Sequence, residues 1–165
     1  MNNTLKHIIR LIVLLLLQGL LINNLHFLGV FHPYIYILCL LFLPSSLPRW
    51  VELLIGAAVG LVMDAICSTA GVHMAACVAV SYFRPLMISR LVQDVNRIGS
   101  QICSATLGNW QFTALSGVMI ILHHTLVMLL EAWSVAHLGW LIMSILLSSL
   151  MTFVLVFLYD RTQRW

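Results

Sequence analysis

Runs of apolar residues long enough to cross a lipid bilayer constrain this chain more than any other feature. The run from Leu11 to Leu17 reads LIVLLLL, without the alternation of polar and apolar residues that a transmembrane β-barrel requires. Since 62% of the residues are hydrophobic and 8% are charged, a soluble core does not account for the composition. Backbone groups in lipid must pair within their own segment, so we expect helices.

We predict one all-α membrane domain over residues 1–165, a bundle of six transmembrane helices. A crossing of about 30 Å takes roughly 20 residues. The expected spans are residues 8–25, 33–43, 50–69, 71–91, 110–130 and 138–159. The first follows Lys6 and Arg10 as a signal peptide would, but no small-residue cleavage pattern comes after it, so we interpret it as a retained span. The second is short and lies between Pro33 and Pro44.

The basic residues predict the direction of the spans. With the N-terminus in the cytoplasm, all eight Lys and Arg residues fall on the cytoplasmic side of the six-span arrangement, and the outer connections carry none. Cytoplasmic loops of membrane proteins carry this excess of positive charge. We therefore expect both termini to be cytoplasmic. Arg84, Arg90 and Arg97 would lie around the long polar stretch, where they could contact anionic lipid head groups or a cytoplasmic partner.

A carboxylate, Asp64, lies within the third apolar run. Gly56, Gly60, Asp64 and Ser68 are spaced four residues apart, so they share one helix face. Two glycines at this spacing allow a second helix to approach closely, which predicts a packing seam. Counted from Trp50, Asp64 is roughly 21 Å along the helix, in the outer half of the bilayer. It is either a structural hydrogen-bonding group or a functional charge.

Other polar residues are expected at a similar depth. With Asp64, they form a candidate cluster of His73, His123, His124 and Glu131. Adjacent histidines on a helix point about 100° apart and do not chelate one metal ion as an i, i+4 pair does. We predict instead that one histidine meets Asp64 or Glu131 across the bundle, and that no metal or cofactor is bound.

Two further groups of small residues are interpreted as structural. Ser144, Ser148 and Ser149 are expected to bond back to their own helix. The four cysteines show no metal-binding spacing and are expected to pack as small hydrophobic side chains.

The motifs of common enzymes are not found in the sequence. It has no G-x-S-x-G, H-E-x-x-H or phosphate-binding loop pattern. The net charge of +3 comes from thinly spread basic residues, which does not indicate nucleic-acid binding. We therefore expect a protein that is not an enzyme.

The segment from Gly56 to Pro85, GAAVGLVMDAICSTAGVHMAACVAVSYFRP, resembles the signature region of the MreD family of rod shape-determining membrane proteins. That family carries a G-x-x-x-G-L-x-x-D core followed by a short loop and a glycine. The matching residues here are Gly56, Gly60, Leu61, Asp64 and Gly71. The segment HHTLVMLLEAWSVAHLGWLIMSILLSSL, His123 to Leu150, is similar to the corresponding region of one branch of the family.

The resemblance implies a non-enzymatic scaffold in the bacterial inner membrane that supports rod shape and lateral peptidoglycan synthesis. It implies MreC as the direct partner and MreB, RodA and a penicillin-binding transpeptidase as indirect ones. The MreD family is also similar in architecture to the substrate-capture subunits of energy-coupling-factor transporters. The alternative is therefore a small-molecule binding or transport subunit. Ligand pockets usually combine aromatic and polar groups. The outer half of the predicted bundle is expected to contain few aromatic residues, which weighs against the transport alternative.

Overall fold

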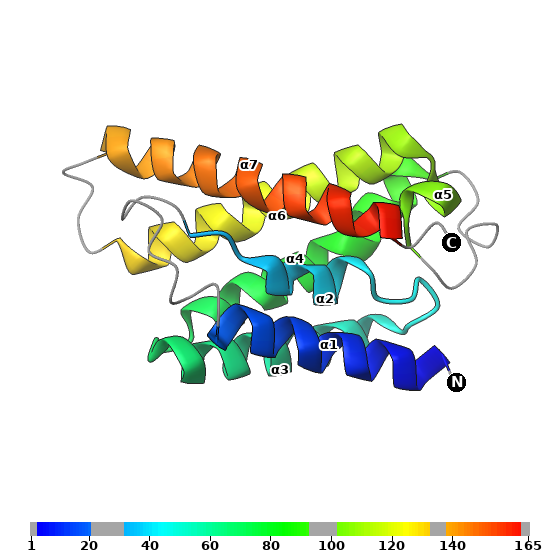
Figure 1. Cartoon of the computed structure of the whole chain (residues 1–165), viewed down its shortest axis with the longest axis horizontal. Helices are drawn as coiled ribbons and strands as arrows, with labels where there is room; N and C mark the ends of the chain where they lie inside the picture. Colours follow the sequence, from blue (N-terminus) through cyan, green and yellow to red (C-terminus); the bar gives the residue numbers. More distant parts are fainter. Residues whose placement is uncertain (1–2, 21–31, 93–101, 133–137, 163–165) are drawn as a thin grey trace.

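The computed structural model describes residues 3–20, 32–92, 102–132 and 138–162 (Figure 1). Every regular element in these ranges is helical, which confirms the predicted all-α class. The elements are α1 (Asn3–Leu20), the 3-10 helix η2 (Ile35–Ile37), α2 (Leu38–Leu41), α3 (Arg49–Cys67), α4 (Val72–Leu91), α5 (Ser104–Leu107), α6 (Asn109–Glu131) and α7 (Leu138–Thr162).

Four of these helices, α3, α4, α6 and α7, are long and apolar enough to span a membrane. They correspond to the predicted spans 50–69, 71–91, 110–130 and 138–159, and no helix end differs from the prediction by more than three residues. The apolar part of α1, Ile9–Leu20, is shorter than these four. The predicted first span continues to residue 25, and residues 21–25 lie outside the described part of the chain.

The long helices run roughly parallel (Figure 1). α4 packs between α3 and α6, and α6 packs against α7. α1 lies beside α3, η2 and α2. α1 and α3 begin, and α4 and α7 end, at the same end of the bundle. Arg49 begins α3, while Arg90 and Arg161 lie in the last turns of α4 and α7, so these three basic residues share that end.

The predicted second span, residues 33–43, is only partly helical. Only η2 and α2, residues 35–41, are helical, and the chain before them is irregular. Seven helical residues rise about 10 Å, far less than a bilayer crossing. The side chains from Tyr34 to Leu43 are all buried among the longer helices, and Tyr36, Ile37, Leu40 and Leu41 are fully buried. We call residues 32–43 the core segment.

Polar side chains of α1 and α7 satisfy the irregular backbone of the core segment. Gln18 donates from Nε2 to the Pro33 carbonyl at 3.1 Å and accepts from the Ile35 amide at 2.7 Å. Thr152 Oγ1 accepts from the Tyr34 amide, and Ser148 Oγ accepts from the His32 amide, both at 3.1 Å. Irregular backbone is tolerated at membrane depth only where protein groups pair with it. Ser148 thus accepts a bond from outside its own helix, whereas Ser144 and Ser149, which were also predicted to bond back to their helix, have no hydrogen-bond partner for Oγ among the described residues.

Candidate functional site

The two glycines of α3 lie where α4 approaches most closely. A Cβ atom built on Gly60 would be 2.7 Å from the His73 carbonyl oxygen, and one built on Gly56 would be 2.9 Å from the Cys77 carbonyl oxygen. Real side chains do not tolerate such contacts with backbone, so α4 could not pack here against any larger residue. The spacing of Gly56 and Gly60 thus corresponds to a tight α3–α4 seam.

Asp64 lies one turn beyond Gly60 and holds the beginning of α4. Its Oδ1 accepts hydrogen bonds from Thr69 Oγ1 at 2.5 Å and from the His73 amide at 2.9 Å, and its Oδ2 accepts from the Met74 amide at 3.0 Å. These amides belong to the first turn of α4, whose N–H groups have no partner within the helix. A carboxylate placed there satisfies the donors and interacts favourably with the helix dipole.

The predicted partner of Asp64 is therefore only partly right. Residue His73 does meet Asp64, but through its backbone amide and not through its imidazole. Side-chain hydrogen bonds from Asp64 to His123 or His124 do not occur in the described part of the chain. The carboxylate serves as a cap supplied by the preceding helix.

Ser68 does not continue the seam as predicted. α3 ends at Cys67, and Ser68 follows with φ of 57°, in the left-handed conformation that commonly ends a helix. Its side chain is exposed. The turn at Ser68, with Gly71 at φ of 83°, folds the chain back within four residues, so that the first turn of α4 reaches Asp64.

The histidines of α4 and α6 meet through a tyrosine of the core segment. The Tyr36 hydroxyl lies 2.8 Å from His73 Nδ1 and 2.6 Å from His123 Nε2. All three residues are at most 1% exposed. The predicted cluster did not include Tyr36, because hydropathy alone does not show how deeply residues 33–43 are buried.

The number of available protons determines which group donates and which accepts in this chain of hydrogen bonds. The Tyr36 hydroxyl has one proton, so it donates to one histidine and accepts from the other. If it donates to His73 Nδ1, the neutral His73 ring carries its proton on Nε2, which lies 4.0 Å from Glu131 Oε1. His123 then donates from Nε2 to Tyr36. This order directs an N–H toward the carboxylate. His123 Nδ1 has no partner among the described residues.

His124 belongs to a separate network beside the first. Its Nδ1 donates to the Ile120 carbonyl at 2.9 Å, so in the neutral ring Nε2 is free to accept from Thr152 Oγ1 at 3.2 Å. Thr152 Oγ1 in turn accepts from the Tyr34 amide. The Tyr34 ring packs against all three histidine rings, with centroids 5.2–5.6 Å apart.

The five residues of the predicted cluster thus divide into three arrangements. His73, His123 and Glu131 line one chain through Tyr36, while Asp64 acts on the backbone and His124 turns toward α7. No group of three or more His, Cys, Asp or Glu side chains in the described ranges could hold a metal ion. The expectation of few aromatics is wrong, since Tyr34 and Tyr36 lie at the centre of the cluster.

A buried ion pair lies in the part of α4 nearer its C-terminal end. Arg84 Nη1 donates to Glu52 Oε1 at 2.8 Å, and the same guanidinium donates to the carbonyls of Leu41 and Leu43. Arg84 is fully buried and Glu52 is 2% exposed. The expectation that Arg84 contacts lipid head groups or a partner is therefore wrong. Arg90 is exposed, and Arg97 lies outside the described residues.

A second buried acid was missed by the sequence reasoning. Asp160 is fully buried near the end of α7. Its carboxylate accepts from the Ser104 amide at 2.9 Å and from the Ser104 hydroxyl, and so holds the short helix α5. Like Asp64, it satisfies donors at the start of a helix.

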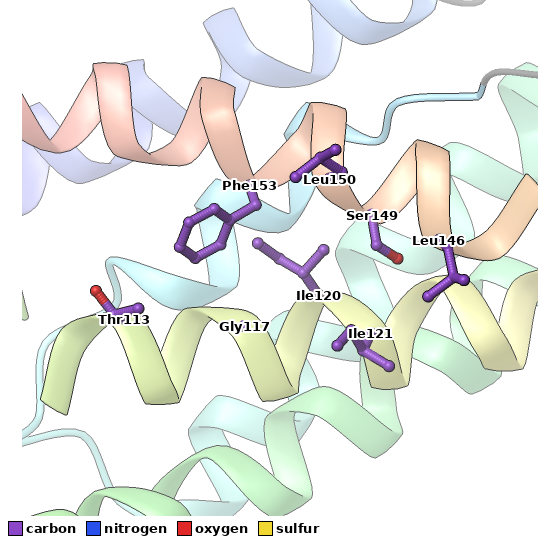
Figure 2. Close-up of a pocket in the computed structure, with 8 residues that line it drawn as sticks. All are labelled: Thr113, Gly117, Ile120, Ile121, Leu146, Ser149, Leu150 and Phe153. Carbon is purple, nitrogen blue, oxygen red and sulfur yellow. The ribbon is translucent and has the colours of Figure 1, made fainter. Parts of the chain in front are cut away.

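Two hollows open beside α6 and α7. One is an apolar groove of about 340 Å³, shown in Figure 2, with Gly117 in α6 and Leu150 and Phe153 in α7 among its lining residues. A Cβ atom on Gly117 would meet nothing within 4 Å. The other is a cavity of about 240 Å³ where α6 ends and α7 begins, lined by Glu131, Trp140 and Ser144 among others.

Comparison with known proteins adds no relative. No family model, curated protein or solved structure matches this chain.

Proposed function

We propose that this protein is a non-enzymatic scaffold of the bacterial cell-elongation machinery, located in the cytoplasmic membrane with both termini inside the cell. Its direct partner would be MreC, and through MreC it would act with MreB, RodA and a penicillin-binding transpeptidase. The proposal starts from the resemblance of residues 56–85 and 123–150 to the MreD family.

The residues that carry the resemblance have structural roles in the α3–α4 hairpin. Gly56 and Gly60 allow α4 to approach α3, and Asp64 has both oxygens engaged by donors at the start of α4. A carboxylate occupied in this way has little capacity left to bind a substrate. The signature would thus preserve a rigid α3–α4 hairpin rather than a reaction centre.

The observation that carries the proposal is the apolar groove beside α6 and α7 (Figure 2). The groove lies on two helices of spanning length. Leu146 and Leu150 stand beside it with 58% and 62% of their surface exposed, while Gly117 leaves open space at its base. Helices associate in membranes by packing at small residues of this kind. We propose that the single span of MreC packs into this groove.

A matched pair of glycines tests the proposal. A Cβ atom on Gly117 meets nothing within 4 Å, so Gly117→Leu places its side chain in the open groove, and the protein should accumulate normally but lose co-purification with MreC. Gly139→Leu is the control, because Gly139 is equally open and does not line the groove. Equal recovery of MreC with both variants would exclude this groove as its binding surface.

The wider role is tested in a rod-shaped host. Depletion of the protein should convert rods into spheres, and Gly139→Leu but not Gly117→Leu should restore the rods. Normal shape together with loss of uptake of one small molecule would favour the transport alternative. One observation favours this alternative: Tyr34 and Tyr36 place aromatic rings beside the histidines, as a ligand pocket would require.

A further inference from the structure

The cavity between the end of α6 and the start of α7 has a carboxylate and a hydroxyl among its lining residues, and the proposed scaffold role uses neither. Its volume is about 240 Å³. At ~30 Å³ per water in the liquid, this corresponds to about eight waters, which is room for a small polar group with a short carbon chain. Met128 and Leu141 line it as apolar walls.

The cavity contains a carboxylate with unused capacity. The side chain of Glu131 is 40% exposed, and its one ion-pair contact in the described chain is His73 Nε2 at 4.0 Å. That distance exceeds a direct hydrogen bond. The described residues that line the cavity include no Lys or Arg. The charge at this site therefore favours a cation.

A buried hydroxyl and an indole complete the lining. Ser144 is 1% exposed, and its Oγ has no hydrogen-bond partner among the described residues. A buried polar atom without a hydrogen-bond partner destabilises the protein. A ligand that supplies the partner removes this penalty and therefore binds more tightly. Trp140 contributes an aromatic ring, which attracts cations through its face.

We propose that this cavity binds a primary ammonium group. Such a group carries three N–H donors: one would serve the Glu131 carboxylate and a second the Ser144 hydroxyl, while the Trp140 ring attracts the charge. A quaternary ammonium has no N–H and would leave Ser144 unpaired. The ammonium belongs either to a small free amine or to the head group of an ethanolamine lipid. The inference is independent of MreC binding.

The free-amine arm uses the full-length protein in nanodiscs of phosphatidylglycerol. Thermal unfolding is followed while ethanolamine is added, with ethylene glycol as the neutral control in which a hydroxyl replaces the ammonium. The lipid arm uses native mass spectrometry to compare retention of phosphatidylethanolamine and phosphatidylcholine. Stabilisation by ethanolamine identifies the free-amine source, and retention of phosphatidylethanolamine alone identifies the lipid source.

Three variants locate the binding. Glu131→Gln should weaken binding of the ammonium about 10- to 100-fold, the range expected for loss of a charge-assisted hydrogen bond. Ser144→Ala should weaken it about threefold to tenfold, whereas Ser149→Ala should not, because Ser149 is also buried and unpartnered but lies outside the cavity. Trp140→Leu should weaken binding, and Trp110→Leu, at an exposed tryptophan elsewhere, should not.

The proposal is overturned if neither amine source is preferred over its neutral or quaternary control. It is also overturned if Glu131→Gln binds as tightly as the unchanged protein, or if Ser149→Ala weakens binding as much as Ser144→Ala. Each variant is first checked for an unchanged elution volume, and binding is compared only among variants that are folded.

Discussion

Replacing Asp64 offers a quantitative test of its role as the cap of α4. In Asp64→Asn, the remaining oxygen can still accept from Thr69 and the His73 amide, but the new NH₂ group faces the Met74 amide, which then has no acceptor. The Met74 amide is part-buried, so leaving it without an acceptor costs about 1 kcal/mol, the lower end of the range for buried donors. In Asp64→Leu, both amides lose their acceptor, which costs about 2 kcal/mol or more. The part-exposed Thr69 hydroxyl can turn to water in either case.

Hydrogen bonds in membrane proteins are weaker on average, about 0.6 kcal/mol. On that scale the two costs become about 0.6 and 1.2 kcal/mol, and the twofold ratio between Leu and Asn is the same. The ratio is therefore the firmer prediction. Thr69→Val removes a bond that water can replace and should cost less than Asp64→Asn.

The assay is reversible unfolding of the purified protein in mixed detergent micelles, followed by tryptophan fluorescence. The reasoning is refuted if Asp64→Asn and Asp64→Leu are destabilised equally, or if Thr69→Val is destabilised as much as Asp64→Leu. A different result would reverse the interpretation: Asp64→Asn of unchanged stability that fails to support cell shape would make the charge itself functional.

Three further predictions follow from the topology and the buried networks. Reporter fusions at Asn24, Ala70 and Ser134 should be read as outside and those at Ser46, Gly99 and the C-terminus as inside; a cytoplasmic signal at Ser134 would contradict the predicted orientation of the helices on either side of it. Arg84→Met should lower the unfolding free energy by about 3–5 kcal/mol, because it leaves Glu52 buried without its counter-ion, and the double change with Glu52→Leu should recover most of that loss. A double variant no more stable than Arg84→Met would argue against the ion pair as the cause. Tyr36→Phe should destabilise the protein by about 1–3 kcal/mol in the same assay by removing the partner of two histidines, whereas Tyr34→Phe, which keeps its ring against the same histidines, should have the smaller effect.

The long helices could be predicted from sequence because length and hydropathy are local properties. An apolar run of about 20 residues has few alternatives to a membrane-spanning helix, and α3, α4, α6 and α7 follow that rule. The seam at Gly56 and Gly60 was predictable for a similar reason, since helical periodicity places the two glycines on one face.

The partner of Asp64 depends on the connection between two helices, which periodicity does not describe. The left-handed turn at Ser68 and the positive φ of Gly71 bring the amides of His73 and Met74 onto the carboxylate. Side-chain chemistry alone favours the imidazoles as partners of Asp64. The N–H groups at the start of α4 have no partner within the helix, and they bind the carboxylate instead.

The placement of Arg84 shows the limit of counting charges. The positive-inside rule assigns a residue to one side of the membrane and says nothing about the direction of its side chain. Arg84 lies within α4, and its guanidinium points into the protein, where Glu52 and two carbonyls of the core segment receive it. The surface role predicted for it belongs at most to exposed residues such as Arg90.

Polar residues scattered through the apolar runs share one explanation in the structure. Gln18, Thr152 and Arg84 come from three different helices, and each bonds to backbone of the core segment. Had residues 33–43 lain in the middle of a longer membrane-spanning helix, these amides and carbonyls would have paired with the neighbouring turns, and these side chains would have had no such role. In addition, the side chain of Tyr36 in the core segment forms hydrogen bonds with His73 and His123 of the surrounding helices. Buried polar residues on several spans are therefore evidence for an irregular segment inside a membrane bundle, and here they indicate residues 32–43.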